Sequence, residues 1–200
     1  GVYFEEEYKR IYPGGSLAAD VVGFTTSDNR GQYGLEEFYN ETLNGIAGRE
    51  YGYLNEEDEV ERTVKAAING NTIHSTIDSN IQGIVEKYLK EFNEENKNAA
   101  KEGNGAENVG CIIMECNTGN VLAMASYPTY DLNALVAGGK EAMAILGDSR
   151  NLLLNYGIHA RGTPGSIFKL VTAAAALEEG VLTPRTKILD TGRYTSYASP

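Results

Sequence analysis

Residues 164–180 read PGSIFKLVTAAAALEEG and place a serine directly after a Pro-Gly pair. The stretch from Ser166 to Glu179 contains Phe168, Val171, Ala174, Ala175 and Leu177, and Gly180 follows as a typical helix terminator. These features predict one buried helix that begins at Ser166.

Ser166 and Lys169 are three residues apart on this helix and therefore share a face. A lysine in that position can take the proton of a serine hydroxyl, and the free N–H groups at a helix start favour developing negative charge. Ser-x-x-Lys arises by chance about once in a chain of this length. The alternative is therefore a serine that caps the helix and a solvated lysine.

The residues before this helix predict a mixture of strands and helices. Thr72–Ile77 alternates as a strand does, and Asp78 or Ser79 is a suitable N-cap for a following helix with an apolar stripe. Two strands, Val109–Glu115 and Asn120–Ser126, flank a turn and predict a hairpin buried on both faces. Helical pieces are expected between Leu132 and Leu154.

The first 68 residues contain many turn signals and predict short elements, including a short helix from Leu35 that ends at Asn44-Gly45. Its apolar positions, and the stripe Ile81, Ile84, Val85, Tyr88, Leu89 and Phe92 of the later helix, are interpreted as core.

Composition narrows the classes of partner. The net charge of −11 argues against binding to nucleic acid or to an anionic membrane surface. No apolar run is long enough to cross a bilayer. Two histidines far apart and two cysteines without a Cys-x-x-Cys pattern predict neither a metal site nor a cofactor.

Several motifs together resemble those of class B penicillin-binding proteins. Residues 164–174 resemble their nucleophile segment, residues 110–128 (GCIIMECNTGNVLAMASYP) the hairpin that opens their transpeptidase domain, and Thr76-Ile77-Asp78 with Ile81-Gln82 the start of that domain. The first region resembles their non-catalytic pedestal at Arg10, Tyr12-Pro13, Leu17-Ala18, Val22-Gly23, Gly34-Leu35-Glu36 and Tyr39-Asn40.

The resemblance implies an α+β fold in which a partial pedestal over residues 1–68 precedes the first part of a transpeptidase domain over residues 69–200. That domain would combine an antiparallel sheet with helices, as in serine β-lactamases. Ser166 would be the nucleophile, with its N–H in the oxyanion hole, and Lys169 the general base. No cofactor or metal is implied.

The implied activity is that of a peptidoglycan D,D-transpeptidase that cross-links stem peptides through an acyl-enzyme and is trapped by β-lactam antibiotics. The whole protein would be anchored in the bacterial cell membrane and act on its extracytoplasmic face beside cell-wall synthesis proteins such as a glycosyltransferase. A D,D-carboxypeptidase, a β-lactam sensor or a non-catalytic scaffold are the alternatives.

The sequence also departs from the family pattern. Ser27-Asp28-Asn29 precedes the nucleophile, where the family places its Ser-x-Asn motif afterwards, and no Lys-Thr-Gly or Lys-Ser-Gly occurs. The residues after Lys169 are too few to complete the domain. We therefore expect a fragment with at most weak activity of its own.

Overall fold

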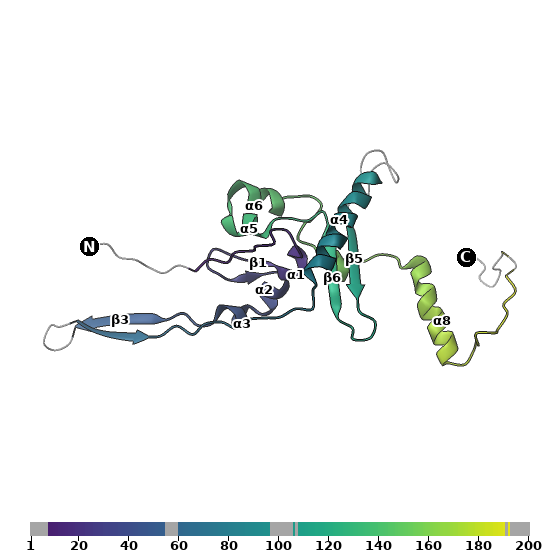
Figure 1. The fold of residues 1–200 in the computed structure, drawn as a ribbon, viewed down its shortest axis with the longest axis horizontal. Helices are drawn as coiled ribbons and strands as arrows, with labels where there is room; N and C mark the ends of the chain where they lie inside the picture. Colours follow the sequence, from purple (N-terminus) through teal and green to yellow (C-terminus); the bar gives the residue numbers. More distant parts are fainter. Residues whose placement is uncertain (1–7, 55–59, 97–105, 107, 191, 193–200) are drawn as a thin grey trace, which may run out of the picture. The chain divides into compact units, whose positions relative to one another are not determined.

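A computed structural model of the chain describes residues 8–54, 60–96, 106, 108–190 and 192 (Figure 1). The chain divides into two compact units, Gly1–Ala160 and Arg161–Pro200. Among the described residues, no helix is long and apolar enough to span a membrane.

The first part of unit 1 consists of short elements, as the turn signals predict. In order they are α1 (Ala19–Val22), β1 (Phe24–Thr25), β2 (Gly31–Gln32), α2 (Gly34–Phe38), α3 (Asn40–Asn44), β3 (Arg49–Leu54) and β4 (Val60–Lys65). The predicted single helix ending at Asn44-Gly45 is instead two helices that meet at Tyr39. Phe38 is exposed, so the assignment of this apolar position to the core was wrong.

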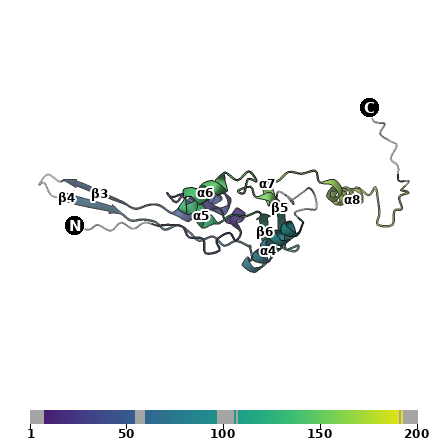
Figure 2. The same cartoon turned by 90° about the horizontal axis from the view of Figure 1, so that it is seen from above.

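The second part of unit 1 contains the longest helix, α4 (Ser79–Glu95), and the hairpin of β5 (Val109–Met114) and β6 (Val121–Tyr127). Figure 2 shows α4 beside the hairpin, and both elements are in contact. Three short helices follow: α5 (Leu132–Ala137), α6 (Gly139–Leu146) and α7 (Tyr156–His159). The hairpin and the helical pieces confirm the sequence predictions, but the expected burial of both hairpin faces was wrong, because Ile112, Ile113 and Met114 of β5 are exposed.

Helix α4 begins where the sequence predicts. The Asp78 side chain accepts hydrogen bonds from the N–H groups of Asn80 (2.8 Å) and Ile81 (3.0 Å) and so caps the helix. Only part of the predicted core stripe is buried: Val85 packs with Ala123 and Ala125 of β6, and Ile81 and Leu89 flank that cluster. The other stripe residues are exposed, namely Ile84, Tyr88 and Phe92.

The predicted strand at Thr72–Ile77 is wrong. Those residues form no strand, although Thr76 and the adjacent Asp78 bind the outer edge of β6. The Thr76 hydroxyl donates to the Val121 carbonyl (2.7 Å), and the Asp78 N–H donates to the Leu122 carbonyl (2.9 Å). The Thr76 bond comes from a side chain and not from the backbone. The segment therefore contacts β6 without the regular backbone pairing of a β-strand.

Two side-chain amides, those of Gln82 and Asn133, also form hydrogen bonds to backbone groups of distant residues. Gln82 is completely buried and bonds both main-chain groups of Met124, accepting from its N–H (2.9 Å) and donating to its carbonyl (2.9 Å). Asn133 does the same to Tyr12, at 3.0 Å and 2.8 Å. The first amide fixes α4 to β6, and the second fixes α5 to the N-terminal segment.

We expect Gln82→Leu to lower the free energy of unfolding of unit 1 by about 2–3 kcal/mol. Leucine fills a similar volume but leaves the N–H and the carbonyl of Met124 without their partner. Urea titration followed by circular dichroism measures the change. Asn80→Ala, at an exposed position of the same helix, is the control and should change stability little. A Gln82→Leu midpoint equal to that of the unchanged protein would contradict this role.

The main apolar cluster of unit 1 joins residues far apart in sequence. Tyr12, Ala19 and Phe24 pack with residues of the segment after β6, which are Tyr130, Leu132, Leu135, Ala142 and Leu152. This core therefore contains side chains from both of the regions that the sequence analysis separated at residue 68.

Unit 2 contains a short 3₁₀ helix, η1 (Gly165–Ile167), that runs directly into α8 (Phe168–Glu178). The predicted helix is thus present, and Gly180 follows it with φ +67°. Its burial was wrong: Phe168, Leu170, Val171 and Leu177 are exposed. None of the described residues from 161 onward is buried, so this described part of unit 2 has no core of its own.

Candidate active site

The backbone before Ser166 explains why a helix starts there. Pro164 has φ −65°, which its ring enforces, and Gly165 has φ +54°, which glycine adopts without strain. The Ile167 N–H then donates to the Pro164 carbonyl at 3.2 Å. The Pro-Gly pair thus turns the chain into η1, with Ser166 in its first turn.

Ser166 lies in η1 and Lys169 in the first turn of α8, so the two predicted catalytic residues are adjacent along one continuous helical segment. Both side chains are exposed, and the described residues include no hydrogen bond between them. Helical spacing keeps the serine and the lysine on one side. The chemistry available to this pair is transfer of the serine proton to a neutral amine, followed by attack of the serine oxygen on a carbonyl.

Asn155 and His159 lie at the two ends of α7, near the end of unit 1. Asn155 is buried and caps α7, where its Oδ1 accepts from the Gly157 N–H at 2.9 Å. Its amide also donates to the Asp20 carbonyl at 3.4 Å. Asn155 therefore has a structural role that its place before a short helix could have indicated. His159, which closes α7, is exposed.

Motif residues of the predicted pedestal meet in a partly buried ion pair. Arg10 Nε lies 2.8 Å from Glu36 Oε1, and Arg10 Nη2 donates to Glu36 Oε2 at 3.0 Å. The Tyr12 hydroxyl donates to Glu36 Oε1 at 3.2 Å. Burial, and then the negative charge of Glu36, raise the pKa of Tyr12 to about 12. The tyrosine therefore remains a donor throughout the neutral range.

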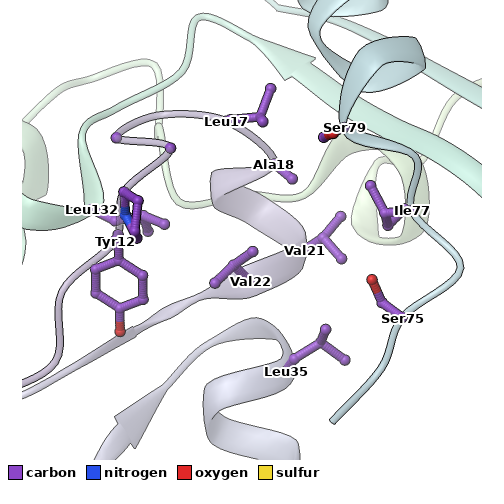
Figure 3. Close-up of a pocket in the computed structure, with 13 residues that line it drawn as sticks. Tyr12, Leu17, Ala18, Val21, Val22, Leu35, Ser75, Ile77, Ser79 and Leu132 are labelled. Carbon is purple, nitrogen blue, oxygen red and sulfur yellow. The ribbon is translucent and has the colours of Figure 1, made fainter. Parts of the chain in front are cut away.

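An apolar cleft of about 270 Å³ lies between residues 12–22 and the segment before α4 (Figure 3). Leu17, Val21, Leu35 and Ile77 line it, with the hydroxyl groups of Ser75 and Ser79 at one side. Ser166 and Lys169 do not line it. The lining of this cleft contains no histidine, lysine or carboxylate.

Two family models match the chain. The model of the penicillin-binding protein transpeptidase domain matches residues 109–199, which include Ser166 and Lys169. The model of the penicillin-binding protein A dimerisation domain matches residues 4–53, which include the Arg10–Glu36 pair.

Known proteins resemble the chain over most of its length. It is 35% identical to penicillin-binding protein PbpB of Mycolicibacterium smegmatis over 90% of this chain and 26% of that protein. It is 31% identical to the peptidoglycan D,D-transpeptidase FtsI of Escherichia coli K12, over 91% of this chain and 28% of that protein.

A solved structure is also similar. Its description reads "Structural coordination of polymerization and crosslinking by a peptidoglycan synthase complex". It matches this chain with a TM-score of 0.67 and 30% sequence identity. The match covers 88% of this chain and 34% of that one.

The chain spans between a quarter and a third of the length of these relatives. The matches include both the short elements of the first part and the segment around Ser166, in the order that the sequence motifs predict. Their α+β fold is the predicted one, with helices beside an antiparallel hairpin. The chain belongs to the class B penicillin-binding proteins, with segments of their dimerisation and transpeptidase domains.

Proposed function

We propose that this chain is part of a peptidoglycan D,D-transpeptidase in which Ser166 is the nucleophile and Lys169 the general base. The observation that carries the proposal is the position of the pair: a serine in the first turn of a helical segment, with a lysine three residues later, inside the region that matches the transpeptidase model. The names of relatives such as FtsI support the same activity.

The reaction would proceed in two steps. The Ser166 oxygen attacks the carbonyl of the penultimate D-Ala of a stem peptide while Lys169 takes the hydroxyl proton. The terminal D-Ala leaves as an amine, which receives a proton from the lysine, and an ester remains on Ser166. An amine of a neighbouring stem peptide then attacks the ester, forms the cross-link and returns the proton to the Ser166 oxygen.

Stabilisation of the tetrahedral intermediate would begin with the N–H of Ser166. From its place at the start of a helical segment, a backbone donor and the positive end of the helix dipole would act on the developing oxyanion. A second donor would come from the family's Lys-Thr-Gly strand, a motif that is absent from these 200 residues. For this reason we expect residues 1–200 alone to have at most weak activity.

The proposed organisation places a pedestal over residues 1–68 and part of the transpeptidase domain over residues 69–200. The dimerisation model falls within the first range and the transpeptidase model within the second. The pedestal would serve as a support without chemistry, and α4 would be the first helix of the catalytic domain.

The whole protein would act on the extracytoplasmic face of the bacterial cell membrane, where stem peptides are joined. We propose a glycosyltransferase as its partner in the cell wall machinery. The similar structure whose description couples polymerization with crosslinking supports this pairing. β-Lactams would acylate the same serine, in line with the name penicillin-binding protein among the relatives.

The decisive experiment offers the full-length parent protein a stem peptide that ends in D-Ala-D-Ala, together with an amine acceptor. Release of D-Ala with transfer of the peptide to the acceptor is the expected result. Release without transfer would replace the transpeptidase by a carboxypeptidase. If D-Ala is not released and the peptide is not transferred, the result would favour the non-catalytic scaffold.

A further inference from the structure

A partly buried carboxyl group, that of Asp20, lies where the two family-matched segments touch, and its Oδ1 atom is shielded from solvent. Asp20 belongs to α1, in the segment that matches the dimerisation model, and α1 packs against β6, in the segment that matches the transpeptidase model. Asn155 holds the backbone at this point by donating to the Asp20 carbonyl at 3.4 Å. The Asp20 backbone is therefore held at the junction of the two segments.

The groups that face the Asp20 carboxyl come from each neighbouring element. They are Glu86 of α4, Ser126 of β6 and Tyr130 of the segment after β6. Tyr33, which precedes α2, acts in turn on Tyr130. None of these groups is a cation, so these described neighbours provide no positive charge to balance an ionised Asp20.

Hydrogen bonding at this place is incomplete. Ser126 and Tyr130 are near enough to favour the charged form of Asp20, but Asp20 Oδ1 and Tyr130 Oη are buried without a partner of ordinary hydrogen-bond geometry in the described part of the chain. The Glu86 Oε1 is already bound by the Ala18 N–H and by Gln82 Nε2, both at 2.8 Å. Its negative charge is thereby held close to Asp20.

The pocket that Asp20, Glu86, Ser126 and Thr129 line has no room for a water molecule. Asp20 as a whole residue is only partly buried, but its Oδ1 atom is shielded from solvent. Ionisation would place negative charge on this oxygen without a solvent contact or a hydrogen-bond partner, and burying such a charge costs more free energy than burying the neutral acid.

We propose that the contact between α1 and β6 is a proton-dependent latch, closed when Asp20 carries its proton and loosened when Asp20 is ionised. Burial is the main cause that raises the pKa of Asp20, to about 6 from 3.8, and the charge of Glu86 adds to it. Burial and the negative charge of Asp20 likewise raise the pKa of Tyr130, which keeps its proton.

The direction of the pH effect follows from these values. The closed junction binds the Asp20 proton more tightly than the opened chain does, so the closed state is favoured most below about pH 4. This advantage is lost as the pH rises through about 6. Two pKa units correspond to a change of up to about a hundredfold in the opening equilibrium.

Amide hydrogen exchange of the 200-residue chain tests the latch when the unchanged protein is compared with Asp20→Asn, which is neutral at every pH. At pH about 7.5, amides of α1 and β6 should exchange at least about tenfold more slowly in Asp20→Asn. At pH about 4 the two proteins should differ only about two- to threefold. Glu41→Gln, at an exposed carboxyl, should show the same ratio at both pH values.

An Asp20→Asn ratio that is equal at both pH values would overturn the proposal. If Asp20→Asn does not fold, carbon-13 NMR of the Asp20 carboxyl in the unchanged protein decides. Titration near pH 6 supports the latch, and titration near pH 4 overturns it.

Discussion

Replacement of Ser166 by alanine is expected to lower the rate at which the parent protein is acylated by a penicillin by about 10⁴-fold or more. Alanine removes the oxygen that forms the ester while the start of the helix is kept, because Gly165 and Pro164 set the turn. Loss of the nucleophile in other serine acyl enzymes has effects of this size. Time courses of labelling with a fluorescent penicillin measure the change.

Two other serines provide matched controls for this result. Ser27 and Ser149 each stand two residues before an asparagine, as the serine of the family's Ser-x-Asn motif does, and both are exposed. Ser27→Ala and Ser149→Ala should be labelled at the rate of the unchanged protein. Labelling of Ser166→Ala at the rate of these controls would exclude Ser166 as the nucleophile.

Lys169→Ala should lower the acylation rate by about 10²- to 10⁴-fold, because no other described side chain is placed on the same helical segment to take the Ser166 proton. Lys169→Arg should be no better, since a guanidinium does not give up its proton and cannot act as a base. Small primary amines in the buffer should restore part of the Lys169→Ala activity, and stopped-flow acylation rates measure both effects.

Lys187→Ala is the control, because Lys187 is an exposed lysine of the same unit. It should react as the unchanged protein does. If Lys169→Arg kept full activity, the lysine would act through its charge and not as a base.

Local sequence patterns predict the elements whose partners are close in sequence. The β5–β6 hairpin needs only two apolar strands around the turn at Asn117–Gly119, and α4 needs its cap at Asp78. The start of the helical segment at Ser166 follows from Pro164 and Gly165 alone. These features were predicted because each is decided within a few residues.

Features that depend on distant residues were not predicted. The pairing of Gln82 with Met124 spans more than 40 positions, and nothing in the residues near Gln82 distinguishes it from an exposed polar position. The residues near Asp20, and those near Arg10 and Glu36, likewise contain no local signal of these contacts. The strand prediction at Thr72–Ile77 failed for a related reason, since its alternation matches contacts with β6 and not a ladder.

The β3–β4 hairpin was missed although a local signal exists. Tyr51 pairs with Thr63 and Glu50 with Val64, and tyrosine, threonine and valine are residues that strands favour. Several charged residues interrupt this pattern, which hid it among the turn signals of the first region. The exposure of α8 could not be predicted from its sequence, because an apolar composition indicates only that the helix favours a partner surface.

The most direct test of Ser166 as the acylated residue is peptide mapping of the parent protein after reaction with a penicillin. Mass spectrometry should find one covalent adduct, equal to the mass of the intact antibiotic, on Ser166 in the peptide that ends at Lys169. An adduct on another serine, or an unmodified protein under conditions that saturate a related transpeptidase, would contradict the account.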